Sequence, residues 1–335
     1  MINIGIIGAG RIGQLHASNL AHHIHNANVV AITDMNEAAA QQTAAALQIS
    51  NVVANHAALL ARADVDAVLI CSSTDTHAGF IEDAARAGKH IFCEKPIAFD
   101  LDEIDRALET VDRAGVKLQI GFNRRFDANA RRMKAGIEQG EVGTVHRLHI
   151  ISRDPSPPPI AYVRRSGGMF VDMTIHDFDM ARFLMGCEAT EIYTAAGVMV
   201  NPEIGAVGDV DTAVITMKFE NGAIVTIDNS REAVYGYDQR MEVFGNAGSL
   251  ESSNLLPDHV THRNNAAVAG AKPLYFFLER YNQSFIVELQ AFIDAIIADE
   301  PVPVSGMDGR MPVVMGLAAR RSYDENRPVR LDEYQ

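Results

Sequence analysis

The chain has 335 residues, of which 47% are hydrophobic and 21% charged, and 43 acidic against 29 basic residues give a formal net charge of −14. This length predicts about two globular domains, and a surface so negative disfavours nucleic acid and anionic membranes as partners. The three cysteines form no disulfide or zinc pattern, and no apolar run approaches the roughly 18–20 residues that span a bilayer, so we expect a cytoplasmic protein without a membrane segment.

Short apolar runs alternate with helical segments over the first third of the chain. Strands are predicted at Ile2–Ile7, Asn28–Thr33, Asp66–Cys71, His90–Cys93 and Lys117–Gly121. Helices are predicted from the first glycine-rich turn to Leu20 and over Asn36–Leu47, Thr76–Ala87 and Asp100–Ala114. Continuous apolar strands that alternate with helices indicate a parallel sheet covered on both faces. Residues 1–121 are therefore predicted to form a doubly wound Rossmann domain of the α/β class.

The pattern changes after Gly121. Strands with alternating or β-branched residues are predicted at Thr144–Ser152, Glu191–Val200, Asp211–Phe219, Ala223–Asn229 and Gln239–Phe244. Asn221-Gly222 predicts a hairpin, because both residues tolerate positive φ. Helices are expected near Gly168–Met185, Phe276–Ala298 and Asp308–Ser322, and the prolines of Arg153–Pro159 indicate a stiff extended loop. Residues 122–335 are therefore predicted to form an α+β domain with a large, mostly antiparallel open sheet.

A glycine-rich motif, Gly8-Ala9-Gly10-Arg11-Ile12-Gly13, lies between the first strand and the first helix. In that context Gly8, Gly10 and Gly13 allow a tight turn and a close approach of backbone N–H groups, including those of Arg11 and Ile12, to a pyrophosphate. Asp34 ends the second strand about twenty residues on, where a carboxylate accepts hydrogen bonds from a ribose and disfavours a 2′-phosphate. The motif therefore predicts NAD as cofactor, although a structural turn and a helix cap are the alternatives for the glycines and Asp34.

Polar residues follow two further strands at the edge where open α/β sheets bind ligands. Ser72, Thr74 and His77 follow the third predicted strand and suit contact with a ribose or phosphate, and helix capping by Thr74 or Asp75 is the alternative. Glu94-Lys95-Pro96 follows the fourth, where the proline favours extended geometry before it and permits a cis bond. Lys95 is a candidate to hold an alcohol oxygen while hydride leaves, and a solvated surface lysine is the alternative.

The segment Gly167–Asp177 contains Asp172 and His176 four residues apart. On one continuous helix both would project from the same face. A His–Asp pair sets the orientation of the imidazole and raises its basicity, as a general base for a secondary alcohol requires. A buried structural pair is the alternative.

Two other dehydrogenase chemistries are excluded by missing residues. No tyrosine has a lysine four residues later, so the Tyr/Lys pair of short-chain dehydrogenases is absent, and the cysteines do not supply the ligands of a zinc alcohol dehydrogenase. His22, His23 and His25 lie on a polar stretch near a helix end, so we expect no metal site.

Taken in order, GxGxxG, Glu94-Lys95-Pro96 and the GGxxxDxxxHD of Gly167–Asp177 resemble the Gfo/Idh/MocA oxidoreductases (glucose–fructose oxidoreductase, inositol dehydrogenase, rhizopine catabolism) over essentially the whole chain. Four segments resemble the inositol dehydrogenases of that family: Gly121–Asp127, Ser152–Pro159, Asp172–Phe183 and Ala233–Gly245.

The resemblance implies that Lys95, Asp172 and His176 form a catalytic trio and that Arg125, Asp154 and Tyr235 help to bind the hydroxyls of a polyol. Glu94 and Lys95 are also expected beside the cofactor. The resemblance further implies oxidation of myo-inositol to 2-keto-myo-inositol with NAD. It also implies a homotetramer built through the open faces of the C-terminal sheets. Two alternatives remain: oxidation of scyllo-inositol or another polyol or pyranose, and a non-catalytic regulator that binds NAD.

Overall fold

The chain forms two compact units in the computed structural model, which describes residues 1–334. Unit 1 contains Met1–Phe126 and Gln283–Val313, and unit 2 contains Asp127–Asn282 and the segment from Val314 onward. The chain passes between the units after Phe126, within helix α11 (Phe277–Ala298) and within helix α12 (Gly306–Glu325). A division at residue 121 would assign residues 283–313 to the second domain, whereas in the structure they pack within unit 1.

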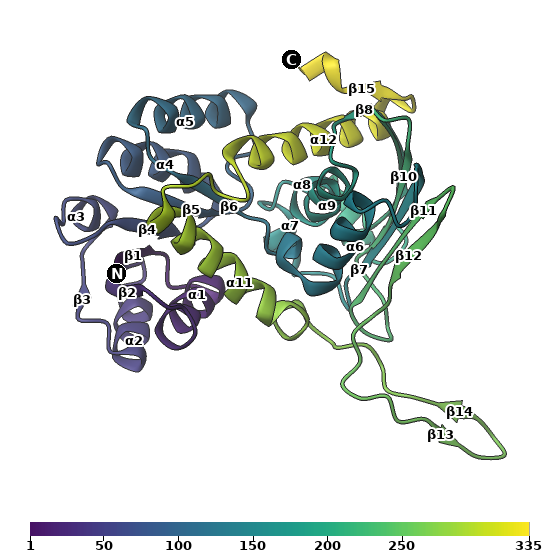
Figure 1. The fold of residues 1–335 in the computed structure, drawn as a ribbon, viewed down its shortest axis with the longest axis horizontal. Coiled ribbons are helices and arrows are strands. Elements are labelled where there is room, and N and C mark those ends of the chain that lie inside the picture. The colour runs from purple at the N-terminus through teal and green to yellow at the C-terminus, as the bar shows by residue number, and fades with distance from the viewer. Residues whose placement is uncertain (335) are drawn as a thin grey trace. The chain divides into compact units, whose positions relative to one another are not determined.

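A parallel sheet of six strands forms the centre of unit 1 within the described residues, in the order β3-β2-β1-β4-β5-β6 (Figure 1). The strands are β1 (Ile2–Ile7), β2 (Ala27–Thr33), β3 (Asn51–Val52), β4 (Ala67–Ile70), β5 (His90–Glu94) and β6 (Leu118–Gly121). This is the order of a Rossmann fold, in which ligands bind at the carboxyl ends of the strands where the order reverses. The predicted doubly wound domain is confirmed.

Helices connect these strands, and several begin at a side-chain cap. They are α1 (Arg11–His22), α2 (Glu37–Leu47), α3 (His56–Leu60), α4 (His77–Arg86) and α5 (Leu101–Ala114), with 3-10 turns η1 (Thr74–Thr76) and η2 (Asn123–Phe126). Asn36, Asn55 and Asp100 each accept a hydrogen bond from a backbone N–H in the first turn of the helix that they precede. One core cluster includes Ile4, Leu69 and Phe92 of the sheet, with Leu289 and Phe292 of α11 packed against it. The sheet of unit 1 is therefore covered partly by a segment from near the C-terminus.

Unit 2 contains a second sheet of seven strands in the described chain, in the order β12-β11-β7-β10-β9-β8-β15. The strands are β7 (Val145–Arg153), β8 (Ala189–Gly197), β9 (Thr212–Phe219), β10 (Ile224–Ser230), β11 (Asp238–Gly245), β12 (Gly248–Ser252) and β15 (Val329–Arg330). The predicted hairpin at Asn221-Gly222 joins β9 to its antiparallel neighbour β10. The β7–β10 pair is parallel, so the sheet is mixed and mostly antiparallel as predicted.

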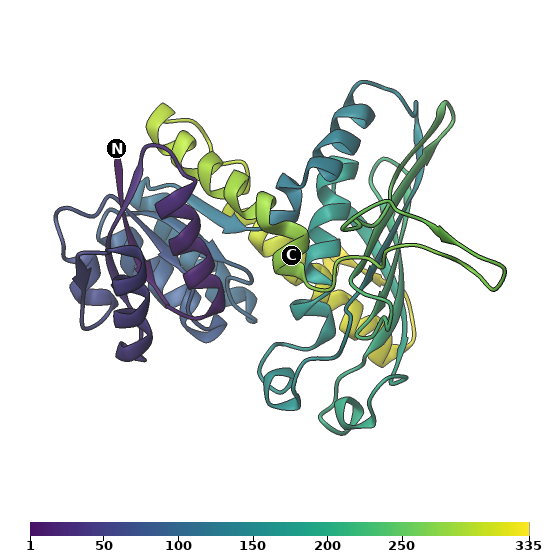
Figure 2. The same ribbon diagram turned by 90° about the horizontal axis from the view of Figure 1, so that it is seen from below.

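One face of this sheet is buried beneath helices and the other is open. Along β9, buried residues alternate with exposed or half-buried ones, as expected for strands with one covered face. The helices of unit 2 lie on one side of the sheet, as Figure 2 shows. They are α6 (Ala128–Glu138), α7 (Ile160–Val163), α8 (Met169–Asp172), α9 (Ile175–Met185) and α10 (Pro202–Ala206), with the last turns of α12 and the 3-10 turn η3 (Leu331–Tyr334).

The prediction of a single helix over Gly168–Met185 is wrong. Helix α8 ends at Asp172 and helix α9 begins at Ile175. The N–H groups of Met173 and Thr174 both donate to the carbonyl of Met169, which closes α8. Asp172 and His176 therefore stand on two helices, and helical i,i+4 spacing does not place them on one face.

A long hairpin extends from unit 2 between β12 and α11. Its short strands are β13 (His262–Arg263) and β14 (Val268–Ala269), and both views show it projecting from the sheet (Figures 1 and 2). The sequence patterns predicted neither this hairpin nor helix α6. Among residues 1–334, no helix is both long and apolar enough to cross a membrane.

Candidate active site

The glycine-rich loop follows β1 and leads into α1. Gly8 has φ +108°, and a Cβ there would lie 2.6 Å from the carbonyl of Cys71, whereas a Cβ on Gly13 would lie 2.0 Å from the carbonyl oxygen of Gly8. These two glycines are therefore required by packing within the loop. A Cβ on Gly10 would meet nothing within 4 Å. Gly10 is exposed at the cap position of α1 and has no side chain to cap the helix, so the helix N-terminus suits an anion such as a pyrophosphate.

Asp34 lies directly after β2 and holds the glycine-rich loop. Its Oδ2 accepts a hydrogen bond from the N–H of Ala9 at 2.6 Å, and its Oδ1 accepts from the N–H of Asn36 at 2.7 Å. A carboxylate oxygen has further lone pairs, so these bonds leave acceptor capacity for a ribose hydroxyl. Asp34 therefore serves as a loop anchor and still fits the predicted ribose contact.

The polar residues after β4 are linked to one another. Ser72 Oγ and Thr76 Oγ1 lie 2.7 Å apart, and Thr76 Oγ1 donates to the carbonyl of Ser73. Helix α4 begins at His77 without a side-chain cap at Thr76, so Thr74 is not the cap of that helix. Thr74 itself lies half-buried in η1. Ser72 and Thr74 thus lie at the carboxyl edge of the sheet, where the prediction required them.

His77 is buried behind this edge. Its Nδ1 lies 2.8 Å from the carbonyl oxygen of Pro96 and its Nε2 lies 3.1 Å from that of Ser72. Burial lowers the pKa of His77, although its hydrogen bonds to the two carbonyls oppose the shift. The ring therefore connects the segment after β4 to the segment after β5.

Glu94 at the end of β5 is paired with a histidine that the motifs did not identify. His16 Nε2 in α1 lies 2.7 Å from Glu94 Oε1, and the His16 side chain is completely buried with its ring edge against Phe92 and Phe285. The pair connects the helix that follows the glycine-rich loop to the Glu94-Lys95-Pro96 segment. A buried carboxylate needs such a donor, because an unpaired one carries a large desolvation cost.

Lys95 follows Glu94 and is half-buried, and the Lys95–Pro96 peptide bond is cis. Arg125 lies in η2 shortly after β6. Its Nη2 donates to Asp308 Oδ1 at 2.9 Å, and Asp308 Oδ2 in turn accepts from the N–H and hydroxyl of Ser305. Within unit 1 the structure thus brings the predicted cofactor residues to one sheet edge and ties Arg125 to the first turn of α12.

The turn between α8 and α9 is fixed by buried side chains of the sheet. Asn229 Oδ1 accepts from Thr174 Oγ1 at 2.6 Å, and Asn229 Nδ2 donates to Asp177 Oδ2 at 2.9 Å and to the carbonyl of Ser152. Thr174 and Asp177 flank His176, and both are buried. The network therefore fixes the start of α9 that carries the candidate base.

Both carboxylate oxygens of Asp172 accept hydrogen bonds. Tyr162 in α7 donates its hydroxyl to Oδ1 at 2.7 Å, and Arg231 donates Nη1 to Oδ2 at 3.2 Å. Arg231 has only 2% of its side chain exposed, and its Nη2 lies 3.8 Å from Asp209 Oδ2. Burial raises the pKa of Tyr162, and so do the negative charges of Asp172 and Asp154. The structure thus groups Tyr162, Asp172 and Arg231 in unit 2.

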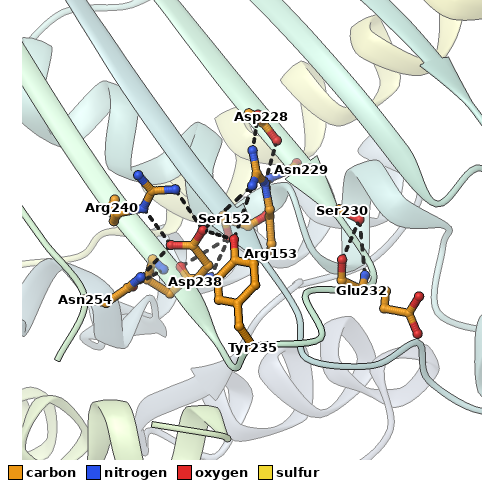
Figure 3. Close-up of polar contacts among 11 residues, drawn as sticks. Ser152, Arg153, Asp228, Asn229, Ser230, Glu232, Tyr235, Asp238, Arg240 and Asn254 are labelled. Carbon is orange, nitrogen blue, oxygen red and sulfur yellow. Dashed lines mark hydrogen bonds and ion pairs between the residues drawn. The ribbon is translucent and has the colours of Figure 1, made fainter. Parts of the chain in front are cut away.

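Tyr235 lies in a different setting from Asp172. Figure 3 shows its hydroxyl directed at Asp238, whose Oδ2 accepts from it at 2.5 Å, while Arg153 Nη1 donates to the same hydroxyl at 3.3 Å. Arg153 on β7 pairs with Asp238 on β11, and the next pair along the two strands is Ser152 with Gln239. The side chains of Ser152 and Gln239 hydrogen-bond each other on the helix-covered face, so those of Arg153 and Asp238 lie on the opposite face. The Tyr235 hydroxyl is therefore held on the open face of the sheet, whereas Asn229 on the helix-covered face contacts Asp177 of α9.

Arg153 also makes a bidentate ion pair with Asp228, and Arg240 makes one with Asp238 (Figure 3). The charges of this open-face cluster are thus matched within unit 2. Among residues 1–334, no three histidine, cysteine or acidic side chains are grouped as metal ligands.

Family models match both parts of the chain. A model described as "Oxidoreductase family, NAD-binding Rossmann fold" matches residues 2–122, and one described as "GFO/IDH/MocA C-terminal domain" matches residues 130–251. Together they cover most of the sequence and include the glycine-rich loop, Glu94-Lys95-Pro96 and the segment of Asp172 and His176.

Curated proteins and solved structures are similar over nearly the full length. A myo-inositol 2-dehydrogenase of Thermotoga maritima is 47% identical over 99% of both chains, and an inositol 2-dehydrogenase of Rhizobium meliloti is 42% identical over 98% of both. A myo-inositol dehydrogenase structure from Corynebacterium glutamicum matches with a TM-score of 0.94 at 36% identity, covering 99% of both chains. The scyllo-inositol dehydrogenase of Lactobacillus casei, solved with NAD(H) and scyllo-inositol, matches with a TM-score of 0.92 at 31% identity and the same coverage.

Proposed function

This chain belongs to the Gfo/Idh/MocA oxidoreductase family, and we propose that it oxidises myo-inositol to 2-keto-myo-inositol with NAD. The observation that carries this proposal is the 47% identity to a myo-inositol 2-dehydrogenase over 99% of both chains. The reaction removes a hydride from a ring carbon and a proton from its hydroxyl, and yields a ketone, NADH and a proton.

The residues of unit 1 fit the cofactor. The open space at Gly10 and the uncapped start of α1 suit a pyrophosphate, and Asp34 suits a ribose with a free 2′-hydroxyl. Ser72, Thr74, Glu94 and Lys95 lie at the edge of the sheet where the rest of a dinucleotide binds in this fold. When bound, NAD supplies the hydride acceptor, and the protein supplies binding and orientation.

His176 is the proposed general base that takes the hydroxyl proton. Imidazole suits this role because its pKa lies near neutral pH in model compounds. Its position at the start of α9 is fixed by Thr174, Asn229 and Asp177. Lys95 is proposed to hold the alcohol oxygen and stabilise the negative charge that develops there.

Asp172 is the proposed third member of the trio. Its carboxylate stabilises the positive charge that forms on His176 or accepts a hydrogen bond from a substrate hydroxyl. Arg125 and Asp154 are proposed to bind further hydroxyls of the ring, which supply donors and acceptors all around it. Tyr235 is also proposed to bind substrate, although its hydroxyl donates a hydrogen bond to Asp238 of the same chain.

The open face of the unit 2 sheet is proposed to pair with further copies in a homotetramer. Val214, Ile224 and Phe244 on that face are between 41% and 51% exposed, and an interface between copies would bury their apolar surface. Light scattering of the purified protein tests this proposal, and a monomer would contradict it.

The experiment that tests the reaction is NADH formation, followed by absorbance, with one polyol at a time. Myo-inositol, scyllo-inositol and glucose are compared at alkaline pH with NAD and then with NADP. The proposal expects the fastest rate with myo-inositol and NAD. A faster rate with scyllo-inositol would keep the reaction and replace the substrate. Absence of turnover with any polyol, alongside measurable NAD binding, would favour a non-catalytic regulator.

A further inference from the structure

Asp172, a proposed catalytic residue of unit 2, accepts a hydrogen bond from a different side chain at each of its carboxylate oxygens. Oδ1 accepts the Tyr162 hydroxyl at 2.7 Å and Oδ2 accepts Arg231 Nη1 at 3.2 Å. The two donors come from distant parts of the sequence, α7 and the segment that follows β10. Together they restrain both the position and the rotation of the carboxylate.

Arg231 is also held through its backbone, and its guanidinium lies near a second carboxylate. Its backbone N–H donates to the carbonyl of Asp211, and its Nη2 lies 3.8 Å from Asp209 Oδ2. Asp209 accepts the N–H of Met169 with both oxygens, at 3.0 and 3.1 Å, at the first residue of α8. The guanidinium therefore lies between two carboxylates, one of which is bonded to the start of the helix that ends at Asp172.

This arrangement also explains a glycine of the motif. Gly168 has φ +78°, and a Cβ there would lie 2.9 Å from Asp209 Oδ1. A side chain at this position would displace Asp209 and, through it, Arg231. The GGxxxD spacing thus serves the placement of Asp172 as well as the start of α8.

The geometry points to Tyr162 and Arg231 as positioning residues that act through Asp172, an inference that rests on the proposed function. Each donor holds one carboxylate oxygen in a fixed direction, and the orientation of the carboxylate sets how Asp172 acts on the proton-transfer partner or substrate. Hydrogen bonds to a charged acceptor are the strong ones, so the loss of either misaligns the carboxylate. Tyr162 is 42% exposed, which places this contact at the solvent-facing side of Asp172.

The test is a double-mutant cycle on the full-length protein with NAD and the inositol that wild type oxidises fastest. Tyr162→Phe removes one hydroxyl from a half-exposed side chain, so the variant folds even if Arg231→Met does not. We expect Tyr162→Phe to lower kcat roughly tenfold or more. In the Asp172→Asn background, the same change is expected to alter kcat by less than about twofold, because the partner is already lost.

Two further readouts separate positioning from damage to the fold. With inositol deuterated at carbon, the isotope effect on kcat is expected to rise in Tyr162→Phe, because the chemical step slows while product release does not. NADH affinity, followed by fluorescence, and the thermal unfolding midpoint are expected to stay near wild type. Arg231→Lys, which keeps the charge, is expected to recover part of the activity lost in Arg231→Met.

Matched controls are available in unit 2. Tyr193→Phe removes a hydroxyl of similar exposure that bonds Asn326, and Arg280→Met removes a buried arginine that pairs with Asp127. Neither is expected to change the isotope effect, and any stability loss in Arg280→Met is expected to persist unchanged beside Asp172→Asn.

An unchanged kcat and isotope effect in Tyr162→Phe would overturn the inference, and so would a loss that persists undiminished in Asp172→Asn. These outcomes leave the wild-type rate intact and are thus distinct from failure of the proposed function. If wild type oxidised no inositol, the proposed function would fail and the inference would fail with it.

Discussion

The carboxylate of Asp34 accepts a hydrogen bond from the backbone N–H of Ala9, with 2.6 Å between Oδ2 and the nitrogen. This bond joins the end of β2 to the glycine-rich loop after β1. The same side chain therefore has two effects on the cofactor, one through the shape of the loop and one through its charge.

Asp34→Ala is expected to weaken NAD binding and to narrow the preference for NAD over NADP, because it removes the loop bond and the charge that repels a 2′-phosphate. Asp34→Asn is the matched variant, since its amide oxygen still accepts from Ala9 while the charge is gone. We expect Asp34→Asn to narrow the preference for NAD over NADP while losing less NAD affinity than Asp34→Ala. Titration of both dinucleotides by fluorescence measures this. An unchanged NAD-to-NADP ratio in both variants would contradict the ribose assignment.

His16→Ala removes the donor that Glu94 has in α1. We expect the affinity for NADH to fall roughly tenfold, the scale of a hydrogen bond to a charged group. His16→Gln keeps a side-chain donor and is expected to recover part of that loss. Unchanged binding in His16→Ala, or an equal loss in both variants, would show that the pair has no role in holding the cofactor edge.

The fold was predictable because its signals are local. Continuous apolar runs such as Ala67–Ile70 indicated buried parallel strands, and Asn221-Gly222 indicated a hairpin, and the structure has both. The sequence pattern did not reveal helix α6, although the Asp127 side chain accepts hydrogen bonds from backbone N–H groups in its first turn. The packing of residues 283–313 within unit 1 depends on tertiary contacts that no local pattern records.

Residues of the candidate site were predictable only where they belong to a short sequence motif next to a predicted strand or helix. Gly8, Asp34 and Lys95 follow strands, so their placement at the sheet edge follows from topology. Arg231 and Tyr162 carry no signal, since nothing in a sequence reveals which distant carboxylate a buried arginine meets. The break after Asp172 was also missed, because the apolar pattern continues through Met173 while the backbone closes α8 there.

His176→Ala is expected to lower kcat by roughly 10²–10⁴-fold, the usual contribution of a general base, with NAD affinity near wild type. Steady-state rates with inositol and fluorescence titration of NADH measure the two quantities. His22→Ala, an exposed histidine of α1, is the control and should leave both unchanged. A parallel loss of NADH binding in His176→Ala would indicate a structural role.

Alkylation of the folded protein at pH 8 is expected to label Cys187 well before the other thiols. Cys71 and Cys93 are buried, and burial raises the pKa of both thiols well above the usual value. Few of these thiols are therefore in the reactive thiolate form, and the reagent cannot reach them in the folded protein. Cys187 is half-buried. Mass spectrometry of peptides from native and denatured protein gives the order of labelling. Early modification of Cys93 in the native protein would contradict the buried core of β5.

Asp238→Asn tests the open-face cluster through the pH dependence of stability. Burial alone would raise the pKa of Asp238, but hydrogen bonds from Arg240, Tyr235 and Asn254 outweigh it and lower the pKa to about 2. An unfolded aspartate has a pKa of about 3.9. The ionised side chain therefore stabilises the fold fully above about pH 4, and this contribution disappears as the pH falls through about 2.

The thermal unfolding midpoint of Asp238→Asn is accordingly expected to lie below wild type at pH 6 and to approach it as the pH is lowered toward 3 and below. Asp112→Asn, which changes an exposed aspartate of α5, is the control and should follow wild type throughout. A deficit in Asp238→Asn that is constant with pH would mean that lost packing, rather than the charge of Asp238, stabilises this part of the sheet. If the difference in unfolding midpoint between Asp238→Asn and wild type disappears at low pH, it arises from the ion pairs of Asp238 with Arg240 and Arg153. Protonation of the wild-type carboxylate removes the same charge as the substitution.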